Sequence, residues 1–381
     1  MEDLLKQNNI ALRNEIEKLQ CDLIDTQSSI PDELKPYAMW VTNVCENIHQ
    51  RVLENIRYLE YRQENLLKDI LSRTQSIAND FAILNQHQAS PILRARTSDR
   101  LPLKLLLWLH TTHSQTENIP VAVGDGVFSI WPIEPSIYFT PCAAQQGLLN
   151  LPIFFHEFGH LLYRYHQQEM NDLVRELQAA IGGLLPLAVD RDDKYTEIQE
   201  QNREVIVQKW YTWTQEFYCD AVGFMMSGPS FAYAFSMYLR ILGRTAYYLS
   251  VEELGRSSHP VAWIRIHLLA DRARQTGYVG VAIDLEEKWN EVATALGIIE
   301  DYGGFYNQSF LPVIQQKLDD MLTETSPREF LESEVSNHQS QSTFTSPVAL
   351  LNMAWHKFLD DPDTYGEWEE GAIESFLETD F

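Results

Sequence analysis

The stretch FFHEFGHLL, residues 154–162, constrains the fold of this chain more than any other segment. His156 and His160 stand four residues apart between two apolar pairs. Side chains at i and i+4 lie on one face of a helix, so both imidazoles could reach the same ion. Glu157 lies about 100° around that helix, where its carboxylate could address a water on the ion without binding the ion itself. The spacing and the apolar flanks therefore predict a buried helix that presents two metal ligands and one general base.

The rest of the chain predicts a mainly helical protein with one small sheet. From 35 to about 86, apolar residues recur at intervals of three, four and seven, which indicates one or two long amphipathic helices. Between 119 and 140 the period changes to two, with glycines and prolines between the runs, which predicts two or three short strands. Helical spacing returns after Leu148. The expected class is mainly α with a small β-sheet (α+β), with the sheet just before the 154–162 helix.

Composition and spacing divide the chain into four regions. We expect an amphipathic helix or short coiled coil over 1–30, a helical region over 31–115, a domain carrying the 154–162 helix over 116–300, and an acidic, mostly helical region over 301–381. The last region has 16 acidic and 3 basic side chains, so it is either solvated or docks on something basic. Within it, residues 333–346, SEVSNHQSQSTFTS, are expected to form a loose linker.

The first helix carries a heptad pattern. Leu5, Leu12 and Leu19 are seven residues apart, and Ile16 and Leu23 continue a second seam. This stripe is typical of a coiled coil, and it also fits an amphipathic helix that packs on its own protein. Three heptads slightly favour the second interpretation, because sustained coiled coils usually need more. Self-association through the N-terminal helices stays open.

The composition excludes several classes of function. A net charge of −25 argues against a nucleic-acid partner, because binding a phosphate backbone requires clustered Lys and Arg. The longest apolar runs, at 105–109 and 181–189, fall short of the roughly 20 residues that span a bilayer, so we expect no membrane segment. The acidic N-terminus does not resemble a secretory signal, and a cytoplasmic location is expected. The four cysteines form no C-x-x-C pair, which favours reduced, mostly buried thiols over a disulfide framework or a cysteine zinc site.

The H-E-x-x-H pattern at 156–160 resembles the motif of zinc-dependent metallopeptidases of the zincin group. The resemblance implies a bound Zn²⁺, a metal-bound water and hydrolysis of peptide bonds. In the metzincin branch the pattern is H-E-x-x-H-x-x-G-x-x-H, and His166 stands at the position of the last histidine. Tyr163 occupies the glycine position, however, and supplies no turn that would bring His166 back to the ion. A metzincin-like site that uses His166 is therefore the less favoured alternative.

The gluzincin branch takes its third ligand from a glutamate on a later helix, with an aspartate four residues beyond. Residues 213–224, WTQEFYCDAVGF, offer Glu216 and Asp220 at that spacing, and they are similar to a segment of ImmA/IrrE-like and HtpX-like peptidases. The resemblance implies that Glu216 completes the ligand set of the two histidines, and that Asp220 accepts the outer N–H of His156. The alternative is a solvated helix face. The strongly apolar neighbours argue against it, since an unpaired carboxylate is costly to bury among them.

A weaker resemblance to HtpX-like peptidases follows at 257–266, where Ser-Ser-His-Pro precedes Arg265. It makes His259 a candidate to steady the oxyanion of the tetrahedral intermediate. An equally good interpretation is the start of a helix, with proline in the first turn. Tyr247 and Tyr248 are further candidate donors.

The sequence therefore predicts a regulated cytosolic zinc endopeptidase with a narrow range of protein or peptide substrates. His156, His160 and Glu216 are the predicted metal ligands, Glu157 is the predicted general base and acid, and Asp220 is expected to orient His156. A regulatory partner could act through the N-terminal helices or the acidic end. The alternative is a helical scaffold or interaction protein with a structural or degenerate zinc site. Glu157 argues against it, because a structural site needs four ligands and no base.

Overall fold

The computed structural model of the chain describes residues 1–61, 66–186, 193–336, 344 and 346–379, without the side chains of 193–199. They form two compact units, Met1–Gln146 and Gly147–Phe381. The described residues are mainly helical and contain one three-stranded sheet. The predicted class, mainly α with a small sheet, is confirmed. Among these residues, none of the helices has the length and apolar character that crossing a membrane requires.

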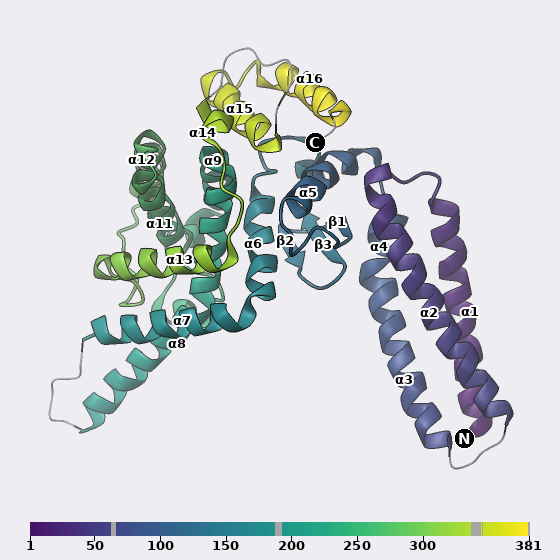
Figure 1. The fold of residues 1–381 in the computed structure, drawn as a ribbon. Helices are drawn as coiled ribbons and strands as arrows, with labels where there is room; N and C mark the ends of the chain where they lie inside the picture. The colour runs from purple at the N-terminus through teal and green to yellow at the C-terminus, as the bar shows by residue number, and fades with distance from the viewer. Residues whose placement is uncertain (62–65, 187–192, 337–343, 345, 380–381) are drawn as a thin grey trace. The chain divides into compact units, whose positions relative to one another are not determined.

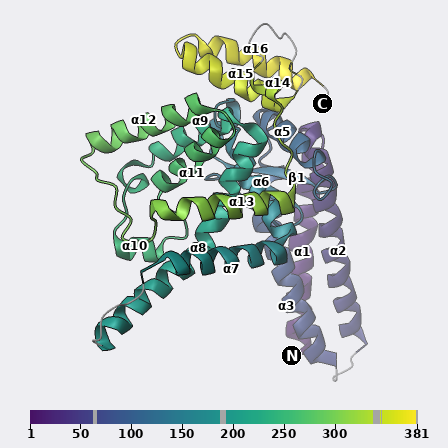
Figure 2. The same ribbon diagram turned by 60° about the vertical axis from the view of Figure 1, so that its left-hand side comes forward.

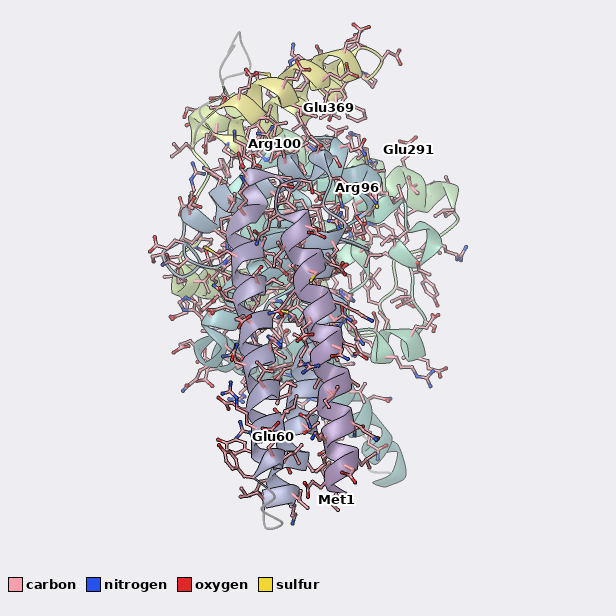
Figure 3. The ribbon with its side chains drawn as sticks, turned by 90° about the vertical axis from the view of Figure 1, so that its right-hand side faces the viewer. Met1, Glu60, Arg96, Arg100, Glu291 and Glu369 are labelled. Atoms are coloured by element: carbon pink, nitrogen blue, oxygen red, sulfur yellow. The ribbon has the colours of Figure 1, made fainter. Side chains whose placement is uncertain are left out.

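The long helices described in the first unit are α1 (Glu2–Thr26), α2 (Lys35–Glu60) and α3 (Leu67–Ile83). They pack side by side, with α2 antiparallel to α1 (Figure 1). Met1 and Glu60 accordingly lie at the same end of this bundle (Figure 3). The apolar stripe of α1 faces α2 and α3 and is buried at Leu5, Ile16, Leu19 and Leu23, while Leu12 is half-buried. The stripe thus packs within its own chain, the slightly favoured of the two interpretations.

Short helices and the sheet complete the first unit. The short helices are η1 (Asp32–Leu34), η3 (Leu84–Gln88), α4 (Ser90–Leu93), η4 (Thr97–Asp99), α5 (Arg100–Thr111) and η5 (Cys142–Gln146). The strands are β1 (Val121–Asp125), β2 (Ser129–Trp131) and β3 (Ser136–Thr140), in the order β1-β3-β2. β1 pairs with β3 in parallel, with Val121 opposite Ser136, and β2 pairs with β3 antiparallel, with Ile130 opposite Tyr138. These are the strands that the change of period predicted.

The described residues of the second unit form helices joined by loops, and none of them lies in a strand. Its longer helices are α6 (Ile153–Tyr165), α7 (Gln167–Leu184), α8 (Asp193–Ser227), α9 (Pro229–Arg240), α11 (Ala262–Gln275), α12 (Val279–Ala295), α13 (Leu311–Thr325), α15 (Pro347–Asp360) and α16 (Tyr365–Glu378). Its short helices are η6 (Gly243–Ala246), α10 (Val251–Arg256), η7 (Gln308–Phe310) and α14 (Glu332–Ser336). α6 packs on α8, and α13 lies alongside α7 (Figure 2). Large aromatic side chains fill the interior around these contacts, among them Phe154, Phe155, Phe158, Trp213, Phe217 and Phe224.

The acidic C-terminal region belongs to this second unit. Trp355 Nε1 donates to the carbonyl of Leu149 at 3.1 Å, and the backbone N–H of Leu148 donates to Glu369 Oε1 at 2.6 Å. These bonds tie α15 and α16 to the segment that leads into α6. The region over 301–379 therefore packs with the helices before it. Along the chain, the first unit ends at Gln146 and the second begins at Gly147. This boundary separates the strands from the 154–162 helix, whereas the domain predicted over 116–300 contained the strands and that helix together.

The predicted loose linker over 333–346 is ordered at both ends. Residues 333–336 lie in α14, where the carboxylate of Glu334 is buried and accepts a hydrogen bond from Arg328 at 2.7 Å. Ser346 donates to the same carboxylate and caps α15, accepting from Ala349 N at 3.2 Å. Residues 337–343 and 345 lie outside the described residues. The prediction of a loose linker was therefore wrong for both ends of this segment. The buried carboxylate of Glu334 holds them in place, because it binds Arg328 before the segment and Ser346 at its end.

Three polar side chains are buried where α1, α2 and α3 meet. Asn9 Nδ2 donates to Thr74 Oγ1 at 3.0 Å and to the carbonyl of Leu5 at 2.8 Å, and Asn55 Nδ2 donates to Thr74 Oγ1 at 3.3 Å. Asn9 and Asn55 are fully buried, and Thr74 is 8% exposed. A buried polar group without a partner is costly, so the network favours the one helix register in which the three side chains meet.

We expect Thr74→Val to lower the free energy of unfolding by about 1–3 kcal/mol, because it removes the hydroxyl that accepts hydrogen bonds from the buried Nδ2 groups of Asn9 and Asn55. Urea unfolding of the full chain measures this. Thr74→Ser keeps the hydroxyl and is the control, with a smaller loss expected. Equal losses in the two variants would show that the hydroxyl contributes nothing.

Candidate metal centre

The site lies where α6 crosses α8, and Gly159 makes the crossing close. A Cβ at position 159 would lie 2.9 Å from the Cα of Cys219, a distance that backbone atoms do not tolerate. The absence of a side chain therefore lets the two helices approach. His156 and His160 flank Gly159 on α6, and the carboxylates at 216 and 220 flank Cys219 in the same way on α8. The two i, i+4 pairs consequently face each other at the closest point of the crossing.

Glu216 lies in contact with both motif histidines. Its Oε2 is 3.5 Å from His156 Nε2, and its Oε1 is 3.8 Å from His160 Nε2. The histidine rings stand at 88° to each other with centroids 5.0 Å apart. Ligands of a tetrahedral zinc ion, each about 2.1 Å from the metal, are roughly 3.4 Å from one another. The two separations from Glu216 are close to that value.

Asp220 and Arg265 hold the other side of His156. Asp220 Oδ1 is 2.9 Å from His156 Nδ1, so Asp220 lies where the resemblance placed it. Arg265, on α11, binds this aspartate with two nitrogens, Nε to Oδ2 at 2.8 Å and Nη2 to Oδ1 at 2.7 Å. Arg265 Nη2 also lies 3.2 Å from Glu216 Oε2. A fork of this kind fixes a carboxylate in position as well as balancing its charge.

Phe235 on α9 supports this arrangement from one side. Its ring stacks on the ring of His156, with centroids 5.5 Å apart and planes at 22°. The guanidinium of Arg265 lies over the same ring, 4.6 Å from its centroid. The contact between the cation and the ring is favourable and excludes water. His156 is therefore fixed by its hydrogen-bond partner and by its ring contact.

Burial controls the charges of the site. It raises the pKa of Glu157 to about 7. Burial by itself would lower the pKa of His156, but hydrogen bonds to Asp220 and Glu216 outweigh it and raise the pKa to about 9. For His160, burial and then the charge of His156 lower the pKa to about 4. Burial opposes ionisation of Glu216, yet His156 and Arg265 hold its pKa well below the usual range. A cation bound by the histidines would lower the pKa of Glu157 in turn.

The residues fit a divalent cation in charge and in donor type. A metal would bind the histidines in their deprotonated form; in that state, with Glu157 ionised, the carboxylates of Glu157, Glu216 and Asp220 would carry three negative charges and Arg265 one positive charge, which leaves two negative charges in a buried site. One divalent cation would neutralise them. Two imidazoles and a carboxylate are also a donor set that zinc takes in catalytic sites.

His259 lies at the rim of the site. It stands between α10 and α11, its side chain is 61% exposed, and its Nε2 is 3.5 Å from Glu216 Oε1. Ser258 Oγ is 2.9 Å from its Nδ1. Tyr247, another candidate donor, is 1% exposed and packs against Trp263 and Trp289, so it belongs to the core. Of these candidates, the structure therefore brings His259 to the predicted metal ligands.

His166 lies elsewhere. The sequence led us to expect an unbroken helix here, but α6 ends at Tyr165 and the chain changes direction at His166 before α7 begins (Figure 1). This turn is made without a glycine, because His166 has a φ of −108° that any residue can adopt. The turn brings His166 Nδ1 to 3.5 Å from Glu324 on α13. Among the described residues, His166 is not part of the cluster that could hold a metal.

Among the described residues, the cluster that could hold a metal consists of His156, His160 and a thiol, Cys219, which the sequence did not point to; Glu216, the predicted third ligand, lies near both histidines but is not in this cluster. A ring nitrogen of His156, a ring nitrogen of His160 and the sulfur of Cys219 lie within 4.8 Å of one another. Burial and the neighbouring carboxylates raise the pKa of this thiol. No C-x-x-C pair points to this thiol as a metal ligand, and only its position between Glu216 and Asp220 could have indicated it.

Two further residues of the site lacked a signal of their own. No sequence pattern pointed to Phe235, and Arg265 appeared only as part of the segment that follows His259.

Comparisons with known proteins assign no family. No family model matches the chain, and no curated protein or solved structure matches it.

We expect Gly159→Ala to lower the free energy of unfolding by about 1–3 kcal/mol, because the new methyl group must push α8 away from α6. Urea unfolding of the full chain measures this loss. Gly183→Ala on α7 is the matched control, because a Cβ at that position would meet nothing within 4 Å. It should raise the free energy of unfolding by about 0.5–1 kcal/mol, since alanine is favoured over glycine in a helix. A Gly159→Ala variant as stable as the parent would mean that the crossing tolerates a side chain.

We also expect Arg265→Met to lower the free energy of unfolding by about 3–5 kcal/mol in metal-free protein, because it leaves buried carboxylates without their cation. Arg274→Met removes an arginine from the same helix, where the ion pair with Glu286 is 41% and 32% exposed, and should cost about 0–1 kcal/mol. Urea unfolding in the presence of a chelator compares the two. Similar small losses would contradict a buried role for Arg265.

Proposed function

We propose that the protein is a zinc-dependent metallopeptidase that hydrolyses peptide bonds in protein or peptide substrates. One observation carries the proposal. Two helices that cross at Gly159 present the histidine pair of α6 to Glu216 of α8, with Glu157 buried beside them. A metal site with three protein ligands and an adjacent carboxylate is the arrangement used for metal-assisted hydrolysis. The gluzincin resemblance is in accord with it.

Each residue then has a role in the reaction. A zinc ion held by His156, His160 and Glu216 would polarise the scissile carbonyl and activate a water. The carboxylate of Glu157 accepts the proton of the attacking water and later delivers it to the leaving amine. Asp220, itself held by Arg265, accepts a hydrogen bond from His156 Nδ1, which leaves Nε2 as the nitrogen that would bind a metal.

His259 is placed to stabilise the oxyanion of the tetrahedral intermediate. Its exposure at the rim leaves it free to meet a substrate, and its Nε2 is on the same side of Glu216 as His160, since both lie near Oε1. A donor held near the place where negative charge develops lowers the barrier more than one that binds the ground state. The contact of Ser258 with His259 Nδ1 orients the ring for this role.

The scaffold alternative explains less of the site. A purely structural metal centre gives no reason to bury a carboxylate at Glu157, where burial raises the pKa of the carboxyl. It also gives no role to an exposed histidine at the rim.

We further propose a narrow range of substrates and regulation by a protein partner, because a cytosolic peptidase must be kept from general digestion.

The test compares Glu157→Gln and Glu216→Ala with the parent. We expect the parent to hold about one zinc per chain, Glu157→Gln to keep it, and Glu216→Ala to lose most of it, by elemental analysis. With a library of fluorogenic peptides, Glu157→Gln should hydrolyse about 10²–10⁴-fold more slowly, since it removes the proton transfer. Removal of zinc by a chelator should abolish hydrolysis, and zinc should restore it.

Glu169→Gln, an exposed change on α7, is the control and should match the parent in both measurements. A parent that binds no zinc would overturn the proposal. A Glu216→Ala variant that stays folded and keeps its zinc would place the third ligand elsewhere.

A further inference from the structure

Cys219 occupies a position that the proposed reaction does not use. It lies on α8 three residues after Glu216 and one before Asp220, so the three side chains share the helix face that meets α6. Its side chain is fully buried. The sulfur lies 3.1 Å from the point where a Cβ of Gly159 would stand, which places it at the crossing itself.

Cys219 forms, with the two motif histidines, the cluster of described residues that could hold a metal, while Glu216 approaches the same histidines from outside this cluster. The Cys219 sulfur and one ring nitrogen each of His156 and His160 lie within 4.8 Å of one another. A tetrahedral zinc ion with bonds of about 2.1 Å to nitrogen and 2.3 Å to sulfur holds these atoms roughly 3.6 Å apart. A change in the Cys219 rotamer or a small shift of α8 would close the difference. Glu216 and Cys219 therefore offer an oxygen and a sulfur to one pair of imidazoles.

We propose that Cys219 is a fourth protein ligand of this metal centre, bound as a thiolate in the resting protein. With His156, His160 and Glu216 it gives four protein ligands, the number found in closed sites that hold no water. Release of the thiol then opens one position for water and substrate. A soft sulfur ligand also makes the centre favour zinc, cobalt or cadmium over magnesium or calcium. This inference rests on the proposed metal site.

Cobalt(II) distinguishes the two ligand sets, because a thiolate bound to cobalt gives a charge-transfer band in the near ultraviolet that nitrogen and oxygen ligands do not give. The metal-free full chain is titrated with Co²⁺ and followed by absorbance. We expect the band to saturate at about one cobalt per chain. Cys219→Ser and Cys219→Ala should lose the band and keep the weaker visible bands of bound cobalt.

Cys45→Ser is the matched control, because Cys45 is equally buried but belongs to α2 in the first unit. It should keep the band. A parent that binds one cobalt without the band, or a Cys219→Ser variant that retains the band, would overturn the role of Cys219 and leave the metal centre standing. A parent that binds no cobalt and no zinc would overturn the metal centre itself, so the two failures are distinguishable.

Discussion

The close crossing of α6 and α8 is the constraint on which the site depends. Gly159 lets the backbones approach until a methyl group would no longer fit, and the residues that flank it are then brought face to face. On each helix the chemically active positions stand three residues before and one residue after the point of contact. The approach of two helices thus converts two separate i, i+4 spacings into one cluster of donors. Without this contact, the histidines and Glu216 would be unrelated polar residues on neighbouring helices.

The site also depends on how the charges of its buried carboxylates are compensated. Glu157, Glu216 and Asp220 bring three carboxylates into a region with little solvent, and the Arg265 guanidinium compensates only part of their charge. Removing charges from water is expensive unless each is paired, so such a group persists only when its partners are held in good geometry. The bidentate bond from Arg265 to Asp220, over the ring of Phe235, supplies that geometry. In the absence of a metal, the protonated His156 adds a second positive charge; a divalent cation, as proposed, would take its place.

The two units use buried polar groups differently. In the first, the hydrogen bonds among Asn9, Asn55 and Thr74 join α1, α2 and α3 and disfavour a shifted helix register. In the second, His156, Glu157, Glu216, Asp220 and Arg265 are buried around the α6–α8 crossing, where ion pairs balance part of the cost of burying them. The C-terminal helices stabilise the segment before α6 through the bonds of Trp355 and Glu369. The acidic end therefore contributes to the unit that holds the site.

Local patterns in the sequence determined the elements and the first ligands. The period of the apolar residues predicted the long helices of the first unit and two or three short strands between 119 and 140, of which the structure has three. The common helix face of His156 and His160 follows from their spacing of four residues. Glu216 and Asp220 were predicted from the resemblance of residues 213–224 to the gluzincin pattern, and their apolar neighbours supported that prediction. Only the tertiary structure brought in Arg265, Phe235 and Cys219, placed the boundary between the units at 146/147, and turned His166 towards Glu324. These features join residues that are far apart in the sequence, up to 158 positions for His166 and Glu324. Such contacts depend on how whole helices pack, which no local spacing records.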